Sequence, residues 1–180
     1  MTDIDKHQIY QIYYDEKTKI ENDKGFRQLD NISNNRADWH EYWPIRNFLT
    51  NTELVANSYY GFLSPKFKEK TGLESKDVYE SLNSSDADIV SFSPYFDQMA
   101  LPINIFEQAI LNHPGIYQCL DHSFRLLRPE SNINTIVMTS RNTIFCNYFV
   151  AKKKYGKNGS GIVKLYLPLL KTLLRQQPRC

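Results

Sequence analysis

Hydrophobic residues along this chain gather in short runs that are separated by longer polar or amphipathic stretches. Runs of β-branched and aromatic residues over 8–14, 59–63 and 88–93 each stop at a polar residue or a proline, and this pattern predicts strands. Further apolar runs over 136–138 and 144–150 predict a fourth and a fifth strand.

The stretches between these runs carry helix signals. Asp38, with Glu41 three residues later, is the predicted N-cap of a helix over 42–49, and Ser75 is the predicted N-cap of a helix over 76–82. Further helical segments are expected over 53–57, 102–111 and 116–127, and a turn or helical turn is expected over 66–71. Polar residues predict loops over 15–25 and from Leu29 onward. Because strands alternate with helices, we expect an α/β fold with a mostly parallel sheet flanked by helices.

The C-terminal region differs from the rest of the chain. Glycines at 156, 159 and 161 separate an expected domain over 1–160 from a tail over 161–180. In this tail leucines alternate with basic residues, and Pro168 interrupts the pattern. We favour a core-packing terminal helix, or the start of a longer chain, and keep an amphipathic helix on a membrane surface as the alternative.

Composition narrows the class of protein. The chain has 180 residues, of which 41% are hydrophobic and 23% charged, as in ordinary globular domains. A net charge of +2 argues against a nucleic-acid partner that is held through phosphate contacts. The three cysteines lack CxxC spacing, and no apolar leader opens the chain, so we expect reduced thiols and a cytoplasmic location.

Common catalytic motifs are absent from the sequence. It contains no GxxxxGK[ST], GxGxxG or GxSxG motif, and its four histidines lack HxxxH spacing. Polar residues at the ends of the predicted strands are therefore the candidates for chemistry, although each has a structural alternative as a cap or a solvated charge. Asp86-Ala87-Asp88 fits a DXD metal motif, but it precedes its strand. We favour a cap and a solvated strand start for these two acids.

Eight longer segments stand out along the chain: QIYYD (11–15), LDN (29–31), DWHEYWPIR (38–46), YGFLSPKF (60–67), KTGL (70–73), NIFEQ (104–108), HPG (113–115) and NYFVAK (147–152). Together these segments resemble a family of small bacterial proteins that accompany glycosyltransferases of polysaccharide biosynthesis. More distantly, their order is similar to that of GT-A-type glycosyltransferases of the sugar-binding, DXD-containing group.

The resemblance implies a GT-A-like fold that moves a sugar from a nucleotide-sugar donor to a surface polysaccharide or a lipid-linked glycan. It implies that the donor is bound by Gln11, Tyr13, Tyr14, Asp15, Arg46, Ser64 and Lys66. Glu107 is the expected base for the acceptor hydroxyl, with Asp97 and His113 as further catalytic candidates. The expected acceptor contacts are Asn104, Gln108 and Asn147.

The chain departs from the GT-A pattern at the metal site. Ser64-Pro65-Lys66 stands where the related transferases carry their DXD acids. The Lys66 ammonium would then neutralise the diphosphate in place of Mn²⁺ or Mg²⁺, and the need for either metal stays open. The alternative function is a non-catalytic module that binds a glycan or a partner enzyme. A third alternative is a scaffold that contacts the inner face of a membrane through its tail.

Overall fold

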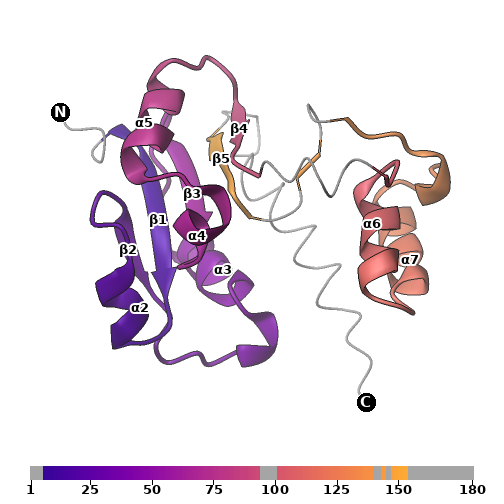
Figure 1. The fold of residues 1–180 in the computed structure, drawn as a ribbon, viewed down its shortest axis with the longest axis horizontal. Helices are drawn as coiled ribbons and strands as arrows, with labels where there is room; N and C mark the ends of the chain where they lie inside the picture. The colour runs from indigo at the N-terminus through magenta and orange to yellow at the C-terminus, as the bar shows by residue number, and fades with distance from the viewer. Residues whose placement is uncertain (1–5, 94–100, 140–142, 145–146, 154–180) are drawn as a thin grey trace. The chain divides into compact units, whose positions relative to one another are not determined.

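A computed structural model describes residues 6–93, 101–139, 143–144 and 147–153. These residues form two compact units (Figure 1). The first unit contains the described residues of 1–93 together with 147–153, and the second contains those of 94–145. The tail over 161–180 and Asp97 lie outside the described residues.

The first unit is built on one mixed sheet with the strand order β2-β1-β3-β5-β4. The strands are β1 (Gln8–Tyr13), β2 (Arg27–Asp30), β3 (Tyr59–Leu63), β4 (Ile89–Ser91) and β5 (Phe149–Lys152). β1 pairs in parallel with both β2 and β3, whereas β5 runs antiparallel to β3 and β4. The α/β class is therefore confirmed, and the sheet is mixed because β5 enters between two strands that run the opposite way.

β3 lies at the centre of the sheet and is buried along its whole length. Its continuous apolar sequence is typical of a strand that is covered on both faces. Gly61 is required there, because a Cβ atom at this position would lie 2.8 Å from Val150 Cγ2 and 3.5 Å from the side chain of Ile9. The glycine thus allows β5 to pack closely against the centre of the sheet.

Helices cover both faces of the sheet (Figure 1). On one face Ile9 and Leu63 pack with residues of α4 (Phe67–Thr71) and α5 (Ser75–Asn83) in the main hydrophobic core. On the other face Phe48 of α3 (Tyr42–Asn51) packs against Tyr10 and Phe62. Alternate residues of β1 and β3 thus face opposite layers.

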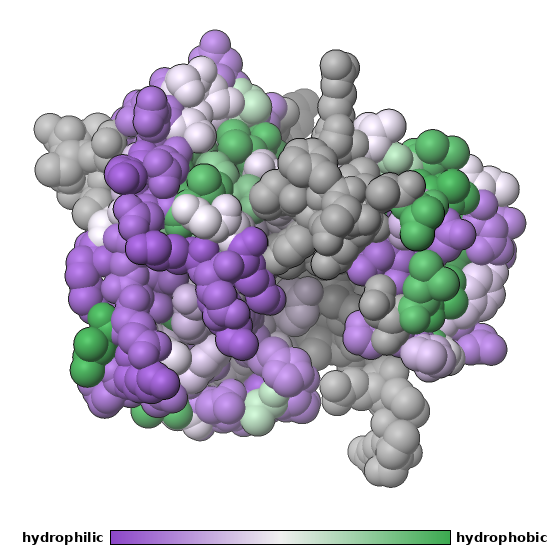
Figure 2. All heavy atoms as spheres, viewed as in Figure 1, coloured by the Kyte–Doolittle hydropathy of each residue, from purple (hydrophilic) through white to green (hydrophobic). Residues whose placement is uncertain are grey.

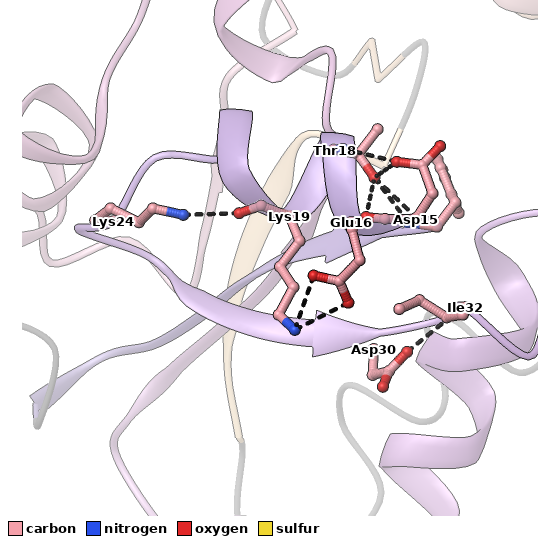
Figure 3. Close-up of polar contacts among 8 residues, drawn as sticks. Asp15, Glu16, Thr18, Lys19, Lys24, Asp30 and Ile32 are labelled. Atoms are coloured by element: carbon pink, nitrogen blue, oxygen red, sulfur yellow. Dashed lines mark hydrogen bonds and ion pairs between the residues drawn. The ribbon is translucent and has the colours of Figure 1, made fainter.

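Several local predictions are wrong. Residues 16–21 form α2 (Glu16–Glu21) and not a loop, because Asp15 accepts hydrogen bonds from the backbone and hydroxyl of Thr18 and caps the helix (Figure 3). The loop expected from Leu29 begins later, since β2 continues to Asp30.

The predicted helix caps are displaced. Asp38 does not cap α3, because it pairs with Arg36 inside the 3-10 turn η1 (Ala37–Trp39). Ser75 is the first residue of α5, and Glu74 is its N-cap. The helices themselves are confirmed, but residues 53–57 are not helical and residues 136–138 form no strand.

The second unit is a helical hairpin. It contains α6 (Ile105–Asn112), α7 (Tyr117–Leu127) and the 3-10 turn η2 (Ile133–Thr135). Phe106 and Phe124 meet edge to face with their ring centroids 5.1 Å apart, so the start of α6 lies beside the end of α7.

Candidate functional site

The carboxyl ends of β1 and β3 form the candidate site. β1 lies between β2 and β3, so the chain first passes from β1 to β2 on one side and then crosses over β1 to β3 on the other side. Ligands of open α/β sheets bind outside the carboxyl ends of the strands at such a switch point. Here β1 is followed by Tyr14 and β3 by Ser64.

Polar side chains from three distant segments meet at this edge. The Tyr14 hydroxyl donates to Glu41 Oε1 at 2.8 Å, and Asn147 Nδ2 donates to Glu41 Oε2, also at 2.8 Å. Asn147 Nδ2 donates in addition to the carbonyl of Phe62 in β3 at 2.9 Å. Glu41 directly precedes α3. Its carboxylate is thus held by Tyr14, which follows β1, and by Asn147, which lies shortly before β5.

A second pair of polar residues, Ser64 and Tyr148, lies at the same edge of the sheet. The hydroxyls of Ser64 and Tyr148 are 2.6 Å apart, and both side chains are buried. The backbone N–H of Lys66 donates to Ser64 Oγ at 3.2 Å and fixes the turn after β3. We call Tyr14, Glu41, Ser64, Asn147 and Tyr148 the edge cluster.

Burial and charge determine the protonation of Tyr14. Burial raises the pKa of its hydroxyl far above the ordinary value, and the neighbouring Glu41 carboxylate, which accepts its hydrogen bond, raises it further. Tyr14 therefore remains a hydrogen-bond donor at all physiological pH values.

Two of the predicted donor contacts are cations: Lys66, which follows β3, and Arg46 in α3. The Lys66 side chain is exposed, and its ammonium forms no ion pair with any residue that the structure describes. The Arg46 guanidinium lies 5.8 Å from the ring centroid of Trp39. The Arg36 guanidinium lies 4.4 Å from the same ring centroid. Both predicted diphosphate contacts thus belong to the first unit and are cations without a carboxylate partner among the described residues.

The other predicted donor residues have internal roles. Gln11 is buried, donates to the carbonyls of Ser64 and Pro65 at 3.2 and 3.5 Å, and accepts from the backbone of Asp23 at 2.9 Å. Tyr13 is buried in β1, and Asp15 is the cap of α2. Gln11 therefore shapes the loop that carries Ser64 and Lys66.

Of the predicted acceptor contacts and catalytic candidates that the structure describes, all lie in the second unit except Asn147. Asn104 caps α6 by accepting from the backbone of Glu107 at 2.8 Å, and its amide donates to the carbonyls of Ile133 and Ile136. The Glu107 carboxylate accepts from the backbone of Ile103 at 2.7 Å. Gln108 lies on α6, and His113 is its exposed C-cap.

The residues at the edge do not fit a divalent metal ion. The Ser64 hydroxyl is buried against Tyr148, and the Lys66 ammonium would repel a cation. Asp86 and Asp88 precede β4, which runs in the same direction as β3, so they lie at the opposite edge of the sheet. In the described part of the chain no three His, Cys, Asp or Glu side chains are grouped closely enough to hold a metal.

A pocket of about 300 Å³ lies on the face of the sheet that α4 and α5 cover, and Gln11 and Pro65 contribute to its wall. Lys68 and Lys76 at its rim both form ion pairs with Glu74. Because these lysines are already paired with Glu74, the pocket offers an anionic ligand less than the exposed ammonium of Lys66 does.

Comparisons with protein-family models, with curated proteins and with solved structures found no match. Among the helices that the structure describes, none is long and apolar enough to cross a bilayer.

Sequence reasoning missed Glu41 and Tyr148 as members of the site. The sequence pattern predicts that Glu41 supports a helix cap and that Tyr148 is one residue of an apolar strand, and neither pattern indicates a site. The available signal was a carboxylate among three aromatic residues, since such a charge needs a partner when it is partly buried.

Proposed function

We propose that this chain is a glycosyltransferase of GT-A-like fold that transfers a sugar from a nucleotide-sugar donor to a surface polysaccharide or a lipid-linked glycan. The observation that carries the proposal is the edge cluster at the switch point of the sheet, next to Lys66, which has no ion-pair partner in the described part of the chain. The carboxyl edge of an open α/β sheet, at its switch point, is the usual place for a nucleotide ligand.

In this proposal the cations replace a metal ion. Lys66 follows β3 at the position where the related transferases carry their metal-binding acids, and its exposed ammonium neutralises the diphosphate. Arg46 contributes a second positive charge from α3. Glu41 holds Tyr14 and Asn147 in place and thereby fixes the surface against which the donor lies.

Calorimetry with nucleoside diphosphates and nucleotide sugars tests this proposal. We expect Lys66→Ala to weaken diphosphate binding about ten- to hundredfold, because a charge-assisted hydrogen bond contributes about 1.5–3 kcal/mol. Lys6→Ala is the matched control, since Lys6 is an exposed lysine that precedes β1 and therefore lies at the opposite edge of the sheet. Absence of binding by every compound, with and without manganese, would refute the proposal.

A second candidate function is a non-catalytic module that binds a glycan or a partner enzyme. The favouring observation is that Glu107 and Asn104 are engaged with the backbone around α6. Glu107→Gln separates the candidates, because it abolishes turnover if Glu107 is the base and leaves glycan binding intact if the chain only binds. A glycan array with the wild-type chain completes the test.

A further inference from the structure

A buried amide lies directly after β2. Polar residues of the first unit lie mainly on its surface, as Figure 2 shows for one face of the molecule. Asn31, in contrast, is only 3% exposed, and its Nδ2 atom is buried without a hydrogen-bond partner among the described residues. A buried donor that has no acceptor destabilises the fold, so its presence calls for an explanation.

Both backbone groups of Asn31 are hydrogen-bonded, so the unmet hydrogen bond belongs to its side chain alone. Its N–H donates to the carbonyl of Tyr13 at 2.9 Å, and its carbonyl accepts from the N–H of Asn34 at 3.1 Å. The next N–H along the chain, that of Ile32, donates to Asp30 Oδ1 at 2.8 Å (Figure 3). These bonds fix the backbone from which the Asn31 side chain projects.

The strand register brings Asn31 to the candidate site. The β1–β2 ladder pairs Tyr13 with Asp30, so the next residues, Tyr14 and Asn31, lie side by side just beyond the two strands. Neighbouring residues of paired strands point to the same face of a sheet. The Tyr14 hydroxyl reaches Glu41 at the start of α3, and the Asn31 amide therefore belongs to that face, next to the edge cluster.

The spacing across the sheet matches the length of a nucleotide. Asn31 follows β2 and Lys66 follows β3, and β1 lies between these two strands. Because neighbouring strands are about 4.8 Å apart, the ends of β2 and β3 are roughly 10 Å apart. A nucleoside diphosphate is long enough to span this distance, with its diphosphate at Lys66, its ribose beside Tyr14 and its base at Asn31.

We propose that the Asn31 amide donates a hydrogen bond to a carbonyl oxygen of the nucleobase and thereby selects the nucleotide. The inference rests on the proposed nucleotide-sugar ligand and goes beyond it by naming the group that reads the base. A buried N–H group rejects a ligand that leaves it unpaired. Uracil, guanine and cytosine each carry a carbonyl oxygen, whereas adenine carries none, so an adenine nucleotide should bind most weakly.

Calorimetry of the full chain with UDP, GDP, CDP, ADP and inorganic pyrophosphate tests the inference. Asn31→Leu should weaken binding of the tightest nucleotide about three- to tenfold and leave pyrophosphate binding unchanged, because pyrophosphate has no base. Asn31→Asp should weaken nucleotide binding at least as much, since a carboxylate oxygen would then face the carbonyl. Lys66→Ala, in contrast, should weaken the binding of both kinds of ligand, because both carry the diphosphate.

A urea titration followed by tryptophan fluorescence separates a ligand contact from a structural role. Removing an unpaired buried group should keep or raise the urea midpoint, so Asn31→Leu should be at least as stable as the wild type. Asn31→Ala, which cannot overpack the site, should show the same loss of nucleotide binding. Asn22→Leu is the matched control: Asn22 is also buried, but its amide donates to acceptors at 2.9, 3.2 and 3.4 Å, so its loss should lower the midpoint.

The outcomes distinguish this inference from the proposed function. Equal nucleotide affinity of the wild type and the Leu and Ala variants of Asn31, or ADP as the tightest ligand, overturns the inference and leaves the proposed function standing. Binding of no nucleotide by the wild type overturns both. A lower urea midpoint of the Asn31 variants with unchanged nucleotide binding would show that an internal water satisfies the amide, and the inference would be wrong.

Discussion

The Asp23 carboxylate joins the loop between α2 and β2 to the start of α5. It accepts from the backbone of Gly25 at 2.8 Å, from the backbone of Ser75 at 2.7 Å and from the Ser75 hydroxyl at 3.0 Å. Partial burial alone would raise the pKa of Asp23, but the hydrogen bonds from Ser75 and Gly25 outweigh it and lower the pKa below its ordinary value. Replacing the carboxylate with an amide is therefore a direct test of this junction.

Asp23→Asn keeps the shape of the side chain but replaces one carboxylate oxygen, an acceptor, with an NH₂ group, a donor, that faces backbone N–H groups. A hydrogen bond to a charged group contributes about 1.5–3 kcal/mol, and the partial exposure of Asp23 reduces this value through solvent screening. We therefore expect a loss of about 1–2 kcal/mol in the free energy of unfolding at pH 7. In a chain of this size such a loss lowers the melting temperature by roughly 2–8 °C.

Tryptophan fluorescence in a urea titration measures the effect on the first unit alone, because both tryptophans, Trp39 and Trp43, belong to it. Since the pKa of Asp23 is lower in the folded state than in the unfolded chain, its contribution is complete above the ordinary aspartate pKa, near 3.8, and disappears as the pH falls through the folded value. The difference between wild type and variant should thus shrink below about pH 4.

Asp86→Asn is the matched control, because Asp86 is exposed on the same unit and should change stability by less than about 0.5 kcal/mol. An Asp23→Asn variant as stable as the wild type at pH 7 would refute the reasoning. A stability difference that persists unchanged to pH 2.5 would show that packing, and not the charge, is responsible.

Three further predictions concern the sheet, the edge cluster and the second unit. Gly61→Ala should cost about 1–3 kcal/mol by overpacking, and adding Val150→Ala should recover part of the loss in the same fluorescence assay. Tyr14→Phe should destabilise the first unit by about 1 kcal/mol through loss of its bond to Glu41, and unchanged urea midpoints would contradict this. Asn104→Ala should accelerate amide hydrogen exchange in 105–112 and 133–138 but not in 8–13; equal protection would show that its three hydrogen bonds are dispensable.

Strands with a strong apolar sequence could be predicted from the chain. β1 and β3 were found because Gln8–Tyr13 and Tyr59–Leu63 are nearly continuous in β-branched and aromatic residues. β2 was missed because Arg-Gln-Leu-Asp has no such pattern, and its pairing with β1 determines its conformation. α2 buries no residue, so apolar periodicity could not indicate it, although Asp15 and Thr18 form a capping box that was open to recognition.

The edge cluster could be predicted only in part. Tyr14, Ser64 and Lys66 could be predicted, because the end of each strand is visible in the sequence of that strand alone. The bond between Asn147 and Glu41 joins residues 106 positions apart, and no local pattern indicates it. The antiparallel direction of β5 was likewise hidden, since a strand's sequence does not record the direction in which it runs.

The place of β5 in the sheet sets an order of assembly during synthesis. Among the strands that the structure describes, β4 pairs with β5 alone, and the described residues of the second unit lie between these two strands in the sequence. On the ribosome β4 must wait without a partner until residues 149–152 emerge, while β3 remains an open edge. Asn147, which contacts Glu41, belongs to the same late segment. A chain that ends before this segment therefore acquires neither the five-stranded sheet nor a complete edge cluster.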